Sequence, residues 1–326
     1  PPDQEAELTE LAARRAEIAG RSEPDPDDQY TRVLEATPIR FTELVVDIAR
    51  RRSLNPLRIS RAVGLLSVAA HQGALGADRA GVVDDRPPPD EADPSVGEPL
   101  GGIDVSFFET PEGRLPPELV TAAAQRRVAC DLFPTECPRV DRLARVATDR
   151  AVASGRVWPS TIDAATAYGD AVGRSVSELG ASDGADPWTP GDPPPPSGGS
   201  WEPTPGSFSP ALEPGARSWR PWNLARGDQF RPPPPPEPGS TEFDEALREV
   251  YDQGTNIGQS ELRVAKFWDL GAGTSTPPGY WLNDAAADSL RSLRVADQAM
   301  AMALVATAAF DTGIAVFDSK YHDLLI

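Results

Sequence analysis

The stretch DQAMAMALVATAAFDTGIAVFDSKYHDLLI, residues 297–326, decides the fold that we predict for this chain. Nearly every position from Ala299 to Phe317 is small or apolar, so a helix here is hydrophobic on all sides. Such a helix is typical of the middle of a bundle, where other helices pack around it. We therefore predict a buried central helix that begins with Asp297 as its N-cap.

Polar residues inside this stretch support two further predictions. Thr307, Asp311, Thr312 and Gly313 interrupt the apolar run, and this argues against a membrane span, which needs about 20 predominantly apolar residues. Asp311 and Asp318 lie two helical turns apart and therefore share one face. Because a lone buried carboxylate is costly, we expect Asp311 to accept hydrogen bonds from a neighbouring helix.

The composition limits the classes of partner. The chain has 326 residues, a net charge of −19 and a pI near 4.5. A nucleic acid or an anionic membrane surface needs an excess of Lys and Arg, so the acidity argues against both partners. The 36 prolines are about twice the ordinary share of roughly 5%.

The two cysteines, Cys130 and Cys137, lie seven residues apart in CDLFPTEC. They are too few for a metal site, because no second cysteine pair exists and the two histidines, His71 and His322, are remote in sequence. A disulfide is one interpretation if the protein is exported. Two unpaired thiols are the other, and the sequence leaves both open.

Helical spacing and capping residues predict a series of further helices around the central one. A loop is expected at residues 84–102, where breakers replace any periodicity, and a linker at 22–28. The expected helices are a short surface helix within 1–20, 41–52, a helix after Asn55-Pro56 to about Leu75, 116–130, 136–154, Ser160 to a left-handed cap at Gly180, a helix capped by Ser240 or Thr241 to Gly254, one capped by Ser260, and one from Asn283 or Asp284 to about Arg294.

Residues 181–239 are rich in proline and contain Trp188, Trp201, Trp219 and Trp222. Disordered tracts are poor in aromatic residues, so we predict an ordered, extended belt around the bundle, with each aromatic side chain in a surface groove. A ligand for proline-binding domains is the alternative. The prediction is an all-α chain organised as residues 1–40 (helix and linker), 41–180 (first helical group), 181–239 (belt) and 240–326 (second helical group), with 41–326 as one domain.

Lys320 is followed by six residues, Tyr321 to Ile326, at the end of the sequence. The segment FDTGIAVFDSKYHDLLI resembles the first signature of the superfamily of vanadium-dependent haloperoxidases and type-2 phosphatidic acid phosphatases: a lysine, six variable residues, then Arg-Pro. LNPLRISRAVGLLSVAAHQGAL, GSWEPTPGSF and VAKFWDLGAGTSTPPGYW also look like segments of the bacterial haloperoxidase-like group. We expect the chain to be the N-terminal part of that fold, ending inside the signature.

The resemblance implies that Lys320 binds vanadate or phosphate, whereas a lysine at a helix C-terminus is ordinarily a surface residue. The second signature of the family, Ser-Gly-His, and the third, an arginine five residues before the axial histidine, do not occur in the sequence. We therefore expect no catalytic residue in these 326 residues and no activity from them alone. His322 fills a variable position, and we expect it to be exposed or at the rim of a pocket, whereas His71 is expected to be a satisfied core histidine.

Three functions follow from these observations. The first is the N-terminal portion of an enzyme that uses vanadate and hydrogen peroxide to oxidise halide. The second is phosphomonoester hydrolysis in the same pocket, and the third is a non-catalytic helical module that binds a partner through its belt.

Family habit and the cysteine pair favour export, and an apolar terminal helix left open on one side would favour a homo-oligomer. The acidic side chains on one further helix lack histidine partners for a di-metal site and are expected to be solvated: Glu242, Asp244, Glu245, Glu249 and Asp252.

Overall fold

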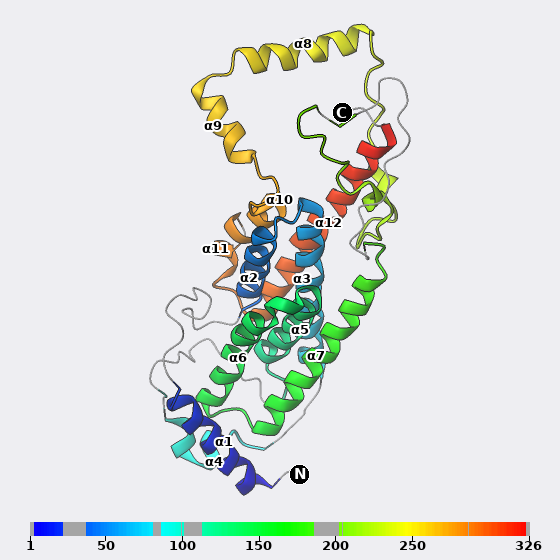
Figure 1. Cartoon of the computed structure of the whole chain (residues 1–326). Coiled ribbons are helices and arrows are strands. Elements are labelled where there is room, and N and C mark those ends of the chain that lie inside the picture. The colour runs from blue at the N-terminus through cyan, green and yellow to red at the C-terminus, as the bar shows by residue number, and fades with distance from the viewer. Residues whose placement is uncertain are drawn as a thin grey trace.

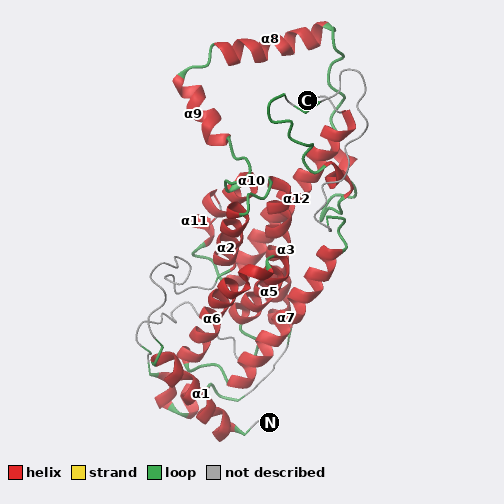
Figure 2. Cartoon of the chain, viewed as in Figure 1, coloured by secondary structure: helices red, strands yellow, loops and turns green. Residues whose placement is uncertain are grey.

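The computed structural model describes residues 3–21, 37–80, 86–98, 100, 113–185, 202–203, 205–285 and 287–323. Within these ranges the regular elements are helices and helical turns, and no strand occurs, as Figure 2 shows by colour. The all-α prediction is therefore confirmed.

The long helices form an elongated bundle with α3 at its centre (Figure 1). Asn55 caps α3 by accepting from the backbone N–H of Arg58 at 3.0 Å, and Pro56 occupies its first position, as predicted. Sixteen of the 24 residues of α3 are buried, and α3 packs against α2, α5, α7 and α12. The helices of the bundle are α2 (Pro38–Arg51), α3 (Pro56–Arg79), α5 (Pro117–Leu132), α6 (Cys137–Ser154), α7 (Pro159–Ala181) and α12 (Val295–Asp323).

The last helix, α12, is apolar all round but is not buried all round. Met300 is 46% exposed, Leu304 65% and Val316 46%, whereas the opposite face packs on α3. The prediction of a central α12 is therefore wrong, and α3 takes that place. Helix α12 also begins at Val295, so Asp297 lies in its first turn instead of capping it.

By length and composition alone, α12 could also cross a membrane, and 39% of its apolar window is buried inside the protein. Core helices of soluble proteins pass the same test, so this is weak evidence for a span. The buried face of α12 carries two carboxylates, Asp311 and Asp318, which is typical of a helix packed against protein. The absence of a membrane span stays a prediction.

Small residues allow α5 and α7 to approach closely. A Cβ atom at Gly169 or Gly173 of α7 would overlap the carbonyl oxygens of Val120 and Ala124 on α5. Gly180 likewise allows α7 to approach α3, since a Cβ atom there would lie 2.9 Å from a methyl group of Leu65. The predicted left-handed cap at Gly180 is wrong, because α7 continues to Ala181.

The remaining elements are peripheral, and several predicted boundaries need correction. The predicted loop at 84–102 contains two short helical turns, and the predicted cap Ser260 lies inside α9, which follows Gly258. The single helix expected from Asn283 or Asp284 to Arg294 is instead a π-helical turn and a four-residue helix, whereas Ser240 caps α8 as predicted. These elements are α1 (Gln4–Ala19), α4 (Pro89–Ala92), η1 (Pro94–Gly97), α8 (Thr241–Thr255), α9 (Gln259–Trp268), α10 (Thr276–Gly279), η5 (Tyr280–Ala285) and α11 (Ala287–Leu290).

Helices α8 and α9 form an arm that projects from the bundle beyond the C-terminal half of α12 (Figure 1). Neither helix has a buried residue. The acidic side chains of α8 are therefore solvated, as the sequence predicts.

Candidate functional site

The described part of the belt packs along the C-terminal half of α12, where Lys320 lies. The belt contains two helical turns, η3 (Pro214–Ser218) and η4 (Gly227–Phe230). Trp219 is 4% exposed and stacks on Phe310 of α12 with a centroid distance of 6.2 Å and an interplanar angle of 19°. The guanidinium of Arg58 lies 4.7 Å from the centre of the Trp219 ring. An ordered belt anchored by tryptophan is therefore observed here.

Other aromatic residues of the belt do not follow that prediction. Phe208 is 66% exposed and Phe230 is 72% exposed, so neither occupies a groove. Trp188 and Trp201 lie outside the described residues. Anchoring is thus shown for Trp219 and for the half-buried Trp222, and not for every aromatic side chain of the belt.

Buried ion pairs attach the belt to α3 at two points, Asp183 near its start and Glu213 in its middle. Arg58 donates from Nε to Oε1 of Glu213 at 2.6 Å and from Nη2 to Oε2 at 2.8 Å, and Asn55 donates to the same carboxylate. Arg61 donates to Asp183 at 2.7 Å, just beyond the end of α7. Because these charges are buried, loss of either partner would leave an uncompensated charge.

The Asp311 carboxylate accepts three backbone hydrogen bonds from the belt. Oδ1 accepts from the N–H of Trp222 at 2.7 Å, and Oδ2 accepts from Asn223 at 2.7 Å and Leu224 at 3.2 Å. The expectation of a donor was right, but its predicted source on a neighbouring helix was wrong. Consecutive backbone amides can converge on one anion without any diagnostic side chain, which explains why the sequence did not reveal them.

Further along α12, Asp318 and Tyr321 attach the belt again. Arg231 donates to Oδ2 of Asp318 from Nε at 2.8 Å and from Nη2 at 2.7 Å. The Tyr321 hydroxyl donates to the carbonyl oxygen of Leu212 at 2.6 Å. Burial and the nearby charge of Glu213 raise the pKa of Tyr321 above its ordinary value. The belt therefore bonds to the end of α12 at one residue before Lys320, Asp318, and at one residue after it, Tyr321.

Lys320 itself is exposed. Its Nζ atom lies 5.5 Å from the centre of the Phe317 ring, and no ion pair between described residues includes it. His322 is also exposed, which is one of the two positions expected for it. Its Nε2 atom lies 3.9 Å from Oδ1 of Asp323. Anion binding by Lys320 stays a prediction.

His71 is half-buried on α3, and burial lowers its pKa below 6.5. Its Nδ1 atom is buried and has no hydrogen-bond partner among the described residues. The prediction of a satisfied core histidine is therefore wrong for this atom. The sequence shows an apolar helix around His71 but not which polar groups approach it.

Cys130 and Cys137 form a disulfide that joins the end of α5 to the start of α6. The structure thereby decides between the two alternatives that the sequence left open. The seven-residue separation closes a tight helix–turn–helix connection.

Comparison with solved structures finds a protein of the same architecture. The crystal structure of the first bacterial vanadium-dependent iodoperoxidase aligns with a TM-score of 0.63 and 26% sequence identity, over 88% of this chain and 68% of that one. This chain has a haloperoxidase-like fold. No protein-family profile and no curated protein matches the sequence.

The haloperoxidase-like fold raises the question of whether these residues can hold vanadate. An oxyanion of that charge requires several cationic or N–H donors, and Lys320 would supply one. The amides at Asp311 and the guanidinium of Arg231 are already bound to carboxylates. These groups therefore do not form a complete vanadate pocket.

Proposed function

We propose that the chain forms the scaffold of a vanadium-dependent haloperoxidase-like enzyme and that Lys320 donates to the bound vanadate. The structural likeness to the iodoperoxidase supports the fold-level part of this proposal. The resemblance of the segment FDTGIAVFDSKYHDLLI to the lysine-containing signature of the family supports the assignment of the ligand. The sequence contains neither Ser-Gly-His nor an arginine five residues before a histidine, so the proposal assigns no catalytic residue to this chain.

The observation that carries the proposal is an ammonium group on a firmly held helix end that has no ion pair with any described residue. Asp318 and Tyr321 bind the belt on either side of Lys320, so the backbone of that turn is positioned. Asp318 is the nearest carboxylate before Lys320 along α12, and it is already bound by Arg231. Asp323, one turn after Lys320, lies 3.9 Å from Nε2 of His322, and we infer that the Lys320 ammonium is available to an anion. A preorganised donor of this kind stabilises charge in a transition state, and its loss typically costs about 10²–10³ in rate.

A phosphatase that hydrolyses phosphomonoesters is the second candidate, because the same donors suit phosphate and vanadate. The belt observations bear on the third, a binding module. Since Trp219 and the amides around Trp222 already bind α12, this part of the belt supports a role in the scaffold over one in partner binding.

The test is vanadate binding by the natural polypeptide that contains these residues, measured by titration calorimetry. Lys320→Ala should weaken vanadate binding by at least tenfold and leave the helical circular dichroism unchanged. Lys266→Ala is the matched control, because Lys266 is the other lysine of the chain and is exposed on α9. Unaltered vanadate affinity in Lys320→Ala would remove the assigned role.

Two activity assays distinguish the candidates. Bromide or iodide oxidation with vanadate and hydrogen peroxide is expected for a haloperoxidase, and hydrolysis of p-nitrophenyl phosphate without them is expected for a phosphatase. Neither activity in the natural polypeptide would refute both enzymatic proposals and favour the non-catalytic module.

A further inference from the structure

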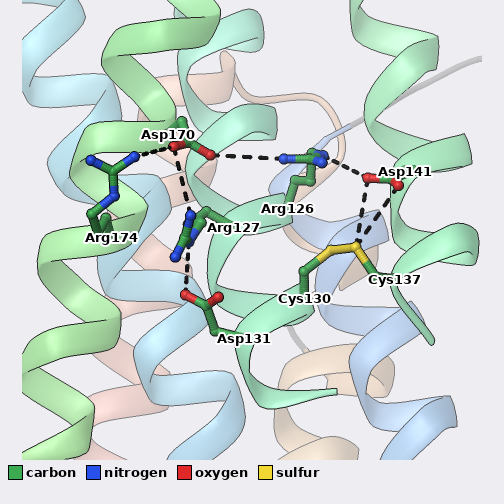
Figure 3. Close-up of polar contacts among 8 residues, drawn as sticks. All are labelled: Arg126, Arg127, Cys130, Asp131, Cys137, Asp141, Asp170 and Arg174. Carbon is green, nitrogen blue, oxygen red and sulfur yellow. Dashed lines mark hydrogen bonds and ion pairs between the residues drawn. A yellow bond between two sulfur atoms is a disulfide. The ribbon is translucent and has the colours of Figure 1, made fainter. Parts of the chain in front are cut away.

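The turn between α5 and α6 brings a third potential metal ligand beside the two cysteines (Figure 3). Cys137 is the first residue of α6, and Asp141 lies one turn later on the same face. The Sγ atom of Cys137 is 3.8 Å from both carboxylate oxygens of Asp141. One ligand atom from each of Cys130, Cys137 and Asp141 lies within 4.8 Å of the others. The prediction that two cysteines are too few for a metal site is corrected here, because Asp141 adds a carboxylate ligand beside them.

We propose that reduction of the Cys130–Cys137 disulfide creates a binding site for a thiophilic divalent cation such as Zn²⁺. The two thiolates and one Asp141 oxygen are the protein ligands, and water fills the fourth position. A dithiol reductant supplies two electrons and two protons to the disulfide and becomes a disulfide itself. Metal binding then releases the two thiol protons. This inference does not depend on the proposed haloperoxidase function.

The positions of the ligand atoms suit tetrahedral coordination. Zn–S bonds of about 2.3 Å and Zn–O bonds of about 2.1 Å place sulfur and oxygen about 3.6 Å apart. The Sγ atom of Cys137 lies 3.8 Å from both oxygens of Asp141 in the oxidised protein, close to that value, and that of Cys130 lies within 4.8 Å of the Asp141 ligand atom. The two sulfur atoms must separate to about 3.8 Å after reduction, as in other tetrahedral thiolate pairs. The Cα atoms lie only 4.7 Å apart, so side-chain rotations suffice.

Charge and hydrogen bonding complete the site. Two thiolates and one carboxylate carry three negative charges, which a divalent cation reduces to one. Arg126 of α5 supplies the compensating positive charge, since its Nε atom donates to Oδ1 of Asp141 at 2.6 Å. Oδ2 of Asp141 then remains for the metal. Such a second partner orients a metal ligand, and its loss typically weakens metal binding about 10- to 100-fold.

The turn has supports other than the disulfide, so the sulfur atoms should stay close after reduction. Phe133 is 1% exposed, and its N–H donates to the carbonyl oxygen of Ala129 at 2.9 Å. The guanidinium of Arg52 lies 5.4 Å from the centre of the Phe133 ring. Arg139, in the first turn of α6, bonds to Glu136 and to Asp47 of α2. The three ligand residues are half-buried, which leaves access for a reductant and a cation.

Cobalt(II) is the probe for this site, because thiolate coordination gives near-ultraviolet charge-transfer bands and tetrahedral geometry gives visible bands. The chain would be reduced with a dithiol, freed of reductant under argon and titrated with Co²⁺. We expect one equivalent to bind with both sets of bands, and Zn²⁺ to displace it. The oxidised chain should show neither set. A reduced chain without thiolate-to-cobalt absorption would overturn the proposal.

Variants test the individual ligands. Cys130→Ser and Cys137→Ser should each abolish the two-thiolate spectrum, and Asp141→Asn should weaken Co²⁺ binding at least tenfold. Asp131→Asn is the matched control, because Asp131 adjoins Cys130 in sequence but bonds to Arg127 at 2.8 Å, away from the disulfide in Figure 3. Wild-type affinity in Asp141→Asn would remove Asp141 from the site. As a second readout, Zn²⁺ should raise the melting temperature of the reduced wild type and not that of the oxidised protein; equal effects on both would also count against the proposal.

Discussion

The Asp311 carboxylate offers the most direct test of how the belt is held on α12. In Asp311→Asn one oxygen becomes an amide NH₂ of nearly the same size. Oδ2 accepts two backbone hydrogen bonds and Oδ1 accepts one, so the asparagine keeps its oxygen toward Asn223 and Leu224. Its NH₂ group then faces the N–H of Trp222, and two donors oppose each other.

The magnitude follows from the bonds that change. One hydrogen bond to a charged group is lost, and such a bond contributes about 1.5–3 kcal/mol. The two remaining bonds lose the contribution of the negative charge, so the loss should lie near the upper end of that range. We expect local opening of the belt to become about 2–3 kcal/mol easier. Since about 1.4 kcal/mol is a factor of ten, the population of the open state should rise roughly 30- to 150-fold.

Hydrogen exchange measured by mass spectrometry reports this opening in peptides that cover residues 220–226. The exchange of these amides should accelerate by the factor given above, while exchange in α3 changes little. The matched control is Asp297→Asn, because Asp297 lies on the same helix and forms only an exposed pair with Arg294. That substitution should change the free energy of unfolding by less than about 0.5 kcal/mol. Exchange of 220–226 within threefold of the wild type in Asp311→Asn would refute the reasoning.

Three further predictions concern other parts of the structure. Burial lowers the pKa of His71 below 6.5, so below about pH 6.5 the unfolded chain binds more protons than the folded chain and the free energy of unfolding should fall. His71→Gln should flatten this pH dependence of the free energy of unfolding in urea titrations between pH 7 and 5. An unchanged slope would contradict the lowered pKa of His71. Trp219→Ala should lower the free energy of unfolding by about 3–5 kcal/mol through loss of the Phe310 and Arg58 contacts, whereas Phe230→Ala, at a side chain 72% exposed, should change it by less than about 0.5 kcal/mol. Leu304 is 65% exposed on the apolar face of α12, so Leu304→Glu should shift the chain toward monomer in sedimentation velocity. Leu247→Glu on α8 is the control. A wild-type chain that is already monomeric would exclude self-association through this face of α12.

Local features of the fold followed from short stretches of sequence. Asn55-Pro56 marked the start of α3, and Ser240 marked the start of α8, because capping depends on one side chain and the next three backbone N–H groups. The helices α5 and α6 were placed within a few residues by their apolar spacing. The similarity of the segment around Lys320 indicated the haloperoxidase-like fold that the structural comparison supports.

Long-range placement did not follow from such signals. An apolar surface shows that α12 can be buried, but burial also requires partners on every side, and within the described residues one face of α12 stays exposed. Gly180 resembles a cap in sequence, although its lack of a side chain serves the close approach of Leu65. Asp141 is an ordinary helical aspartate until the turn brings it beside the disulfide.

The sequence by itself determined the all-α class, the helix starts at Asn55-Pro56 and Ser240, and the need of Asp311 for donors, because each depends on the chemistry of neighbouring residues. Tertiary structure alone decided that α3 occupies the centre, that backbone amides of the belt satisfy Asp311, and that Lys320 is exposed at a fixed helix end. These outcomes depend on which distant segments meet. Backbone N–H groups are present at almost every position, so no residue pattern indicates which of them will converge on a buried charge.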